Sequence, residues 1–245
     1  MKRIVFFILL FLSAAAFAAP ARSMAGSLNL NQVMASPQFS SSVQMILSIA
    51  VISLAPFFLV SVTSFLRIVI VFSLLRTAIG TQQIPPNSVL IGIAIFMTVF
   101  VMSPVLTEIN TVAYLPYQQG KLTEVKAFEA GMKPLSKFML RQTREKDLAL
   151  FVQFARITPP TKAEDVPTYV LIPSFMISEL KTAFQIGFLL FIPFIIIDLV
   201  VANILLSLGM FMLSPVMVSL PFKILLFVLV DGWNLITRGL LMSFR

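Results

Sequence analysis

The chain has 245 residues, of which 58% are hydrophobic and only 11% charged, whereas soluble domains carry about 25% charged residues; it is therefore an integral membrane protein or the core of a membrane-linked assembly. The formal net charge is +8, but the 18 basic residues are too few and too scattered to form a nucleic-acid-binding stripe. The absence of cysteine and histidine excludes a disulfide framework and most metalloenzyme and hydrolase mechanisms, so we expect no catalytic residues, no metal site and no cofactor.

The N-terminus has the pattern of a secretory signal peptide. Two basic residues precede a short apolar run and then a stretch of small residues that includes Ala16. This order predicts cleavage between Ala18 and Ala19, and the apolar run is too short for a retained membrane helix. Residues 1–18 are therefore predicted to be a signal peptide, and the polar residues 19–42 a flexible leader outside the cytoplasm.

Two apolar stretches, residues 43–75 and 89–105, predict a first helical hairpin within residues 43–106. The first stretch would be about 50 Å long as a single helix, well beyond a hydrocarbon core of about 30 Å. We therefore expect it to be kinked or divided between Pro56 and Ser64. A glycine and two consecutive prolines predict a loop between the two stretches.

Residues 107–183 form the one polar region, with ten of the 18 basic and eight of the ten acidic residues. Apolar residues recur there at helical spacing, so the region is predicted to be helical. Phe138 and Phe151 lie on the apolar faces of two of these helices. They are expected to contact a neighbouring subunit or, equally well, to form the core of this region.

Helix boundaries in the polar region are predicted from capping and breaking residues. Thr123 is expected to begin a short helix that Gly131 ends, and Pro134 to begin the next helix. A last helix is expected to begin near Ser174 and to continue into the following apolar stretch.

Residues 184–245 predict a second apolar hairpin with charges inside it. A charged side chain is costly in hydrocarbon unless it faces protein or water. The charges embedded in the apolar stretches are Arg67 of the first hairpin and Asp198 and Asp231 of the second. They are either structurally paired or part of a proton path. Together, the apolar stretches give a four-span arrangement with the polar region on the outer side. Because each stretch contains proline, we infer that much of the apolar surface contacts other subunits.

Five motifs in the same order resemble the FliP family, the export-gate subunit of flagellar and virulence type III secretion. They are TSFLRIVIVFSLLR at 63–76, FMLRQTR at 138–144, SELKTAFQIG at 178–187, IPFIIIDL at 192–199 and LPFKILLFVLVDGW at 220–233. The resemblance covers residues 43–241. The leader with its signal sequence favours the flagellar branch of the family.

The resemblance implies an all-α membrane protein made of bent helical hairpins and a small helical periplasmic region. It implies a homo-pentamer that joins four copies of FliQ and one FliR in a closed helical pore for unfolded flagellar export substrates. FlhB and FlhA would join it in the basal body, at the bacterial inner membrane. In such an assembly much of the complex lies above the bilayer plane, which weakens the simple four-span arrangement.

The resemblance also assigns a role to Met210, Phe211 and Met212. The family places a methionine-rich loop here, which implies a deformable ring around the pore that seals it and yields to passing peptides. Family members often have three methionines in a row, so Phe211 makes this ring bulkier and stiffer. The alternative for this segment is a helix end packed in the core.

Three further charges lie where the polar region enters the third apolar stretch and early in the fourth stretch. Glu179, Lys181 and Lys223 are predicted to form a ring of ion pairs between neighbouring subunits, with Glu179–Lys223 as the preferred pair. Pairing within one chain, or a solvated face, is the alternative.

Two other function classes fit parts of the sequence. Broken helices and buried charges suit a stand-alone ion or small-molecule transporter, but no internal repeat supports it. Asp198 and Asp231 could serve as the carboxylate pair of an intramembrane aspartyl protease, but Asp231 lacks the Gly-x-Gly-Asp context of such enzymes.

Overall fold

The computed structural model describes residues 37–81, 83–157 and 165–244. The predicted signal peptide, its cleavage site at Ala18–Ala19 and most of the leader lie outside these residues. The chain divides into two units, Met1–Ile52 and Ser53–Arg245, and the description below concerns the second. The helix at the boundary begins at Pro37, so the last residues assigned to the leader are helical.

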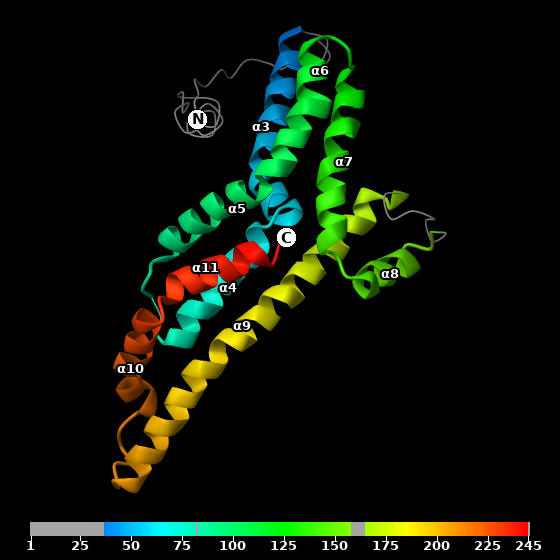
Figure 1. Cartoon of the computed structure of the whole chain (residues 1–245). Helices are drawn as coiled ribbons and strands as arrows, with labels where there is room; N and C mark the ends of the chain where they lie inside the picture. The colour runs from blue at the N-terminus through cyan, green and yellow to red at the C-terminus, as the bar shows by residue number, and fades with distance from the viewer. Residues whose placement is uncertain (1–36, 82, 158–164, 245) are drawn as a thin grey trace, which may run out of the picture. The chain divides into compact units, whose positions relative to one another are not determined.

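Secondary structure in the described residues is entirely helical, which confirms the predicted all-α class (Figure 1). The helices are α3 (Pro37–Val62), α4 (Phe65–Ile79), α5 (Asn87–Ile109), the π-helical turn η2 (Asn110–Tyr114), α6 (Leu115–Gln118), α7 (Glu124–Gln142), α8 (Glu145–Phe154), α9 (Thr168–Ser207), α10 (Pro215–Leu229) and α11 (Gly232–Met242).

The first apolar stretch is divided where the sequence predicts. The segment Pro56–Val62 meets α4 at an angle of 86°. The break falls at Thr63 and Ser64, while Pro56 lies inside α3. The Thr63 hydroxyl accepts a hydrogen bond from the backbone N–H of Phe65 and so satisfies one free donor at the start of α4. The bend thus lies at a polar pair rather than at the proline.

The polar region differs from its predicted boundaries. Thr123 does precede a helix, but α7 continues through both Gly131 and Pro134 and ends at Gln142. The predicted stop at Gly131 and start at Pro134 are therefore wrong. Pro134 is buried, and packing on this face holds the helix together although the proline removes one backbone hydrogen bond.

Helix α9 is the longest element, with 40 residues, and it continues through Pro173 and Pro193. At about 1.5 Å per residue it is about 60 Å long, twice the thickness of a hydrocarbon core. It begins at Thr168, ahead of the predicted start at Ser174. Its most extensive packing is along α4, with α8 and α10 on either side of that contact (Figure 1).

The described residues contain two helical segments that are long and apolar enough to cross a membrane, Asn87–Gln118 and Thr168–Ser207. Two bent pairs raise this number to four if each pair is one span. The bent pairs are Pro56–Val62 with Phe65–Ile79, and Pro215–Leu229 with Gly232–Met242, which meet at 64°.

Two apolar clusters hold the helices together. One joins α4, α5, α9, α10 and α11 around fully buried residues of α4 such as Ile68 and Phe72. The other joins α5, α7, α8 and α9 around Met139 and Phe175. Since α9 contributes to both clusters, it fixes the second hairpin relative to the polar helices.

Candidate functional site

The turn between α9 and α10 presents the Met-Phe-Met segment. Helix α9 ends in a Schellman motif, in which the N–H of Gly209 bonds the carbonyl of Leu206 and the N–H of Met210 bonds that of Leu205. Gly209 has φ = +75°, a left-handed conformation that glycine adopts without steric cost. The motif stops the helix and turns the chain outward immediately before Met210.

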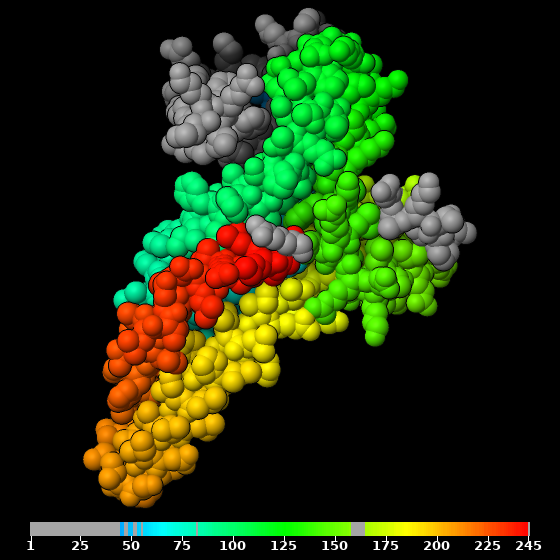
Figure 2. Space-filling model, viewed as in Figure 1, coloured from blue at the N-terminus to red at the C-terminus, as the bar shows by residue number. Residues whose placement is uncertain are grey.

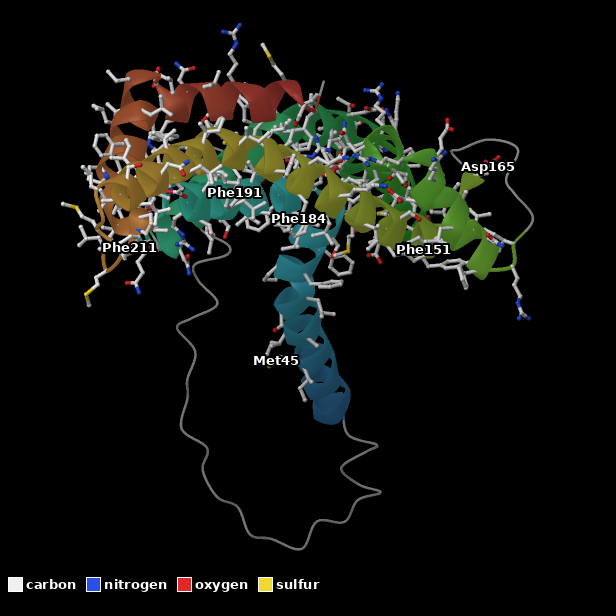
Figure 3. All side chains as sticks on the ribbon, turned by 90° about the horizontal axis from the view of Figure 1, so that it is seen from below. Met45, Phe151, Asp165, Phe184, Phe191 and Phe211 are labelled. Carbon is white, nitrogen blue, oxygen red and sulfur yellow. The ribbon has the colours of Figure 1, made fainter. Side chains whose placement is uncertain are left out.

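The three side chains after this stop lie in the open. Met210 is 47% exposed, Phe211 77% and Met212 100%. The turn forms one end of the 53–245 unit, and Phe211 and Phe151 lie toward opposite ends of it (Figures 2 and 3). The segment is therefore not a helix end packed in the core of this chain, which was the alternative. An exposed cluster of unbranched and aromatic side chains is suited to contact other chains or a passing peptide.

An ion pair with a buried lysine joins the two helices of the hairpin behind the turn. The Nζ of Lys223 on α10 lies 2.7 Å from the Oδ2 of Asp198 on α9, and the Ser219 hydroxyl bonds the other carboxylate oxygen. Lys223 is only 5% exposed, and its Nζ also lies 3.5 Å from the carbonyl of Ala78 at the end of α4. The pair therefore ties α9 and α10 to each other and to the C-terminal end of α4.

A second buried charge cluster lies at the start of α4. The Arg67 guanidinium donates two hydrogen bonds to the carboxylate of Glu179 on α9, one of them from Nε at 3.0 Å. It also bonds the side chain of Gln142 and both the carbonyl and the hydroxyl of Ser243, each at 2.9 Å.

The charged side chains of this cluster are buried. Arg67 is 2% exposed and Glu179 0%, and the guanidinium carbon stands 4.0 Å from the centre of the Phe244 ring. Bidentate pairing of this kind matches the fork of arginine to a carboxylate and offsets the cost of removing both charges from water. The cluster joins α4, α7, α9 and the segment after α11.

The predicted pairing of Glu179 with Lys223 is not the one found within the chain. Glu179 is paired with Arg67, and Lys223 with Asp198. The reason is geometric, because the guanidinium can span several acceptors around Glu179 while the α9–α10 hairpin brings Asp198 to the lysine. Lys181 is exposed and has no ion pair among the described residues.

The two phenylalanines of the polar helices have different surroundings. Phe138 is 8% exposed and packs edge-on against Phe175 of α9, with 6.1 Å between the ring centres. Phe151 is half-buried on α8 and packs against the same cluster. Both therefore contribute to the core of the chain, and their contact with a neighbouring subunit stays a prediction.

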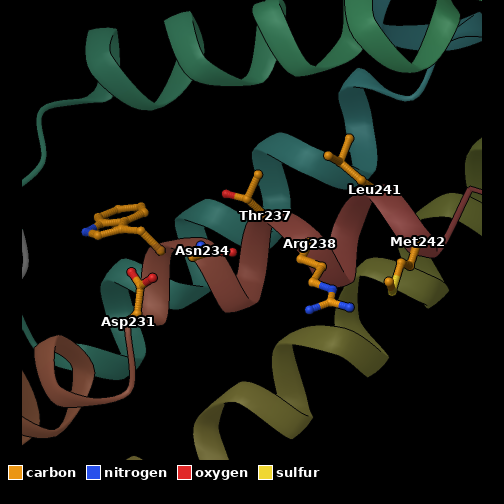
Figure 4. Close-up of a pocket in the computed structure, with 7 residues that line it drawn as sticks. Asp231, Asn234, Thr237, Arg238, Leu241 and Met242 are labelled. Carbon is orange, nitrogen blue, oxygen red and sulfur yellow. The ribbon is translucent and has the colours of Figure 1, made fainter.

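Asp231 stands at the bend between α10 and α11, in a left-handed conformation with φ = +48°. It lines an open hollow along one face of α11, together with Trp233, Arg238 and neighbouring residues (Figure 4). Asp198, in contrast, is bound to Lys223 and Ser219. The structure thus gives each carboxylate its own surroundings and does not pair them as an aspartyl protease requires.

Large apolar side chains cover the outward faces of the helices. On α9 they recur at helical spacing and are exposed: Phe184, Phe188, Ile192, Ile195 and Leu199. On α5 and α10 exposed residues include Phe96, Phe100, Phe222, Leu225 and Val228. A surface of this extent is what a lipid-facing or subunit-facing helix presents.

Sequence reasoning missed the partners of Arg67. Gln142, Ser243 and Phe244 have no periodic or motif signal that links them to Arg67, which is far from them in the sequence. The only available signal was the cost of an unpaired arginine in an apolar run, which predicts a partner without identifying it.

Comparisons with known proteins find similar sequences. Residues 48–240 match the FliP family. The flagellar biosynthetic protein FliP of Bacillus subtilis is 54% identical over 205 residues, which cover 84% of this chain and 93% of that protein. The protein of the same name from Pectobacterium carotovorum is 54% identical over 83% of this chain and 79% of its own length, and that from Caulobacter vibrioides 49% over 92% and 85%.

Proposed function

The chain belongs to the FliP family, and we propose that it is a core subunit of the flagellar type III protein export gate. In this proposal five copies assemble with FliQ and FliR, next to FlhB and FlhA, in the bacterial inner membrane within the basal body. The assembly forms the pore through which unfolded flagellar substrates cross. The chain is then a structural pore subunit and no enzyme.

One observation carries the proposal: the chain neutralises its buried charges internally and leaves apolar surface outside. Arg67 is paired with Glu179 and Lys223 with Asp198, whereas α5, α9 and α10 expose rows of large apolar side chains. A surface without charged partners favours close packing with other helices. Such packing supports an assembly rather than a chain that works alone.

The exposed turn supports the pore itself. Each copy presents Met210, Phe211 and Met212 beyond the end of α9, so a closed ring of copies would gather these side chains at one level. Methionine is flexible enough to fill an irregular gap, and an apolar constriction excludes water and ions when no peptide occupies it. The ring would then seal at rest and deform around a substrate.

Native mass spectrometry of the chain co-expressed with FliQ and FliR tests the assembly. A discrete species with five copies of this chain is the expected result. A monomer that takes up a solute on its own would instead support the stand-alone transporter.

Ion leakage tests the seal. In the assembled complex, Met210→Ala with Met212→Ala is expected to raise the permeability of liposomes to small ions several-fold, because truncation opens the ring. Met242→Ala removes a methionine of α11 that is 51% exposed, close to the 47% of Met210, and serves as the matched control. Equal permeability of the turn variant and the control would refute the seal.

A further inference from the structure

We propose that the α9–α10 turn is also a site of reversible methionine oxidation, and that a peroxide opens the resting seal there. This inference rests on the proposed function, because it concerns the same ring of side chains. It adds a chemical reaction at Met210 and Met212 and a consequence for ion permeability.

Three of the five exposed methionines of the described residues lie in or just after this turn, and the other two are Met45 and Met242. Met212 is 100% exposed, Met210 47% and Met217, just after the turn, 70%. Met97, Met102 and Met139, in the apolar clusters, are between 0% and 8% exposed. Because access of the oxidant to sulfur governs oxidation, Met212 is expected to react first in the second hairpin, ahead of Met210 and Met242, which are 47% and 51% exposed.

The reaction needs only a peroxide as co-reactant. A lone pair of the thioether sulfur attacks one peroxide oxygen, the O–O bond breaks and an S–O bond forms. With hydrogen peroxide the other oxygen leaves as hydroxide, which takes the proton of the transferred oxygen and becomes water. Sulfur is oxidised by two electrons to the sulfoxide and the peroxide is reduced by two, so no protein base or metal takes part. Methionine sulfoxide reductases reverse the product.

Oxidation makes the methionine side chains more polar, whereas the seal depends on apolar side chains. A sulfoxide is a strong hydrogen-bond acceptor, whereas a thioether is a weak one. Each copy would contribute two sulfoxides to the ring, and water bound to them would favour wetting of the constriction. Phe211 stands between the two methionines and is inert to peroxide, so each copy keeps one apolar side chain in the ring. The expected opening is therefore a leak and not a full loss of the barrier.

The test uses the complete complex with FliQ and FliR in liposomes, treated with hydrogen peroxide. Peptide mass spectrometry is expected to show sulfoxide at Met212 forming on the order of tenfold faster than at Met139, with Met210 also ahead of the buried residue. Ion permeability should rise several-fold and return on treatment with methionine sulfoxide reductases.

A second variant tests whether the leak arises from the methionines of the turn. Met210→Leu with Met212→Leu keeps the side-chain volume, so folding and assembly should be preserved, but leucine has no sulfur to oxidise. This variant is expected to be tight before and after peroxide. Met242, exposed on α11, should oxidise in both proteins and report equal exposure to the oxidant.

Three results would overturn the inference: oxidation at the turn no faster than at Met139, oxidation without any change in permeability, or an equal peroxide-induced leak in the leucine variant. These three results can be told apart from failure of the proposed seal, because the permeability of the unoxidised alanine variant tests the seal by itself. If that variant leaks and the oxidised wild type does not, the seal stands and its control by oxidation is wrong.

Discussion

The Arg67–Glu179 pair offers the most direct test of what holds the chain together. Replacing Arg67 with methionine removes every hydrogen bond of the guanidinium while keeping an unbranched apolar stem. Glu179 then remains as a carboxylate with no exposure to water. Replacing Glu179 with methionine leaves Arg67, 2% exposed, without its carboxylate.

The structure indicates the size of the effect. Removing one partner of a buried ion pair costs about 3–5 kcal/mol, because the remaining charge is left without compensation. Arg67 also loses its bonds to Gln142 and Ser243 and its contact with the Phe244 ring. We therefore expect each single variant to lower the free energy of unfolding by about 3–5 kcal/mol.

The double variant separates charge from packing. With both side chains replaced by methionine no charge is stranded, and such apolar replacements of buried pairs are often neutral or stabilising. Here the bonds to Gln142 and Ser243 are still lost, so we expect a net cost of about 1–3 kcal/mol, based on roughly 1 kcal/mol for each hydrogen bond. The double variant should thus be more stable than either single one.

Denaturation of the full chain in detergent provides the assay. Trp233 is the only tryptophan, and its ring centre lies 5.4 Å from that of Phe227 and 6.3 Å from that of Phe72. Its fluorescence therefore reports the packing of α4, α10 and α11. Arg67→Lys is the matched control for charge, since it keeps the cation but loses the bidentate fork, and it should be nearly as destabilised as the methionine variant.

Additive effects would refute this reasoning. If the double variant loses as much stability as the two single variants together, the two side chains do not act as a pair. Single variants within about 0.5 kcal/mol of the wild type, the range typical of surface substitutions, would show that the cluster is not buried as described.

Two further predictions use the same assay. Asp198→Asn should destabilise the chain by about 3 kcal/mol and Lys223→Met by less, because the first change strands a buried ammonium and the second a carboxylate that is 30% exposed; the reverse order would contradict the geometry of this pair. Gly187→Ala should cost about 1–3 kcal/mol relative to Gly92→Ala, because a Cβ at Gly187 would lie 2.3 Å from Cδ1 of Leu74, whereas nothing lies within 4 Å at Gly92. Both glycines are helical, so the gain in helix propensity cancels in this comparison, and equal stability of the two variants would show that α4 and α9 do not cross so closely.

Composition and periodicity predict much of this architecture. An apolar stretch too long for one span predicts the break that falls at Thr63 and Ser64. The cost of embedded charges predicts partners for Arg67 and Asp198, and both are paired. Local rules suffice in these cases because length and desolvation act on each segment whatever its neighbours.

Local sequence rules fail where tertiary packing determines the helix boundaries and the charge partners. Pro134 was expected to begin a helix, yet α7 continues through it, as α9 continues through Pro193. A proline removes one backbone bond, and a helix packed along much of its length can tolerate that loss. The identity of charge partners is also non-local, since Arg67 and Glu179 are 112 residues apart and meet only because α4 and α9 lie side by side.

The pairing within the chain also bears on how copies would recognise one another. Had Glu179 and Lys223 remained free, a charged ring between neighbours would set their register, as the sequence predicts. Because each is buried and has a partner in its own chain, a neighbour finds mainly the exposed apolar faces of α5, α9 and α10 and the polar surface of α7 and α8. Apolar faces specify register by shape, through large side chains that fit between those of the next helix. Charge reversal at Glu179 would then disturb assembly by unfolding the α4–α9 contact, and Lys223→Glu would not rescue it, whereas Arg67→Glu with Glu179→Arg would restore at least part of the pair.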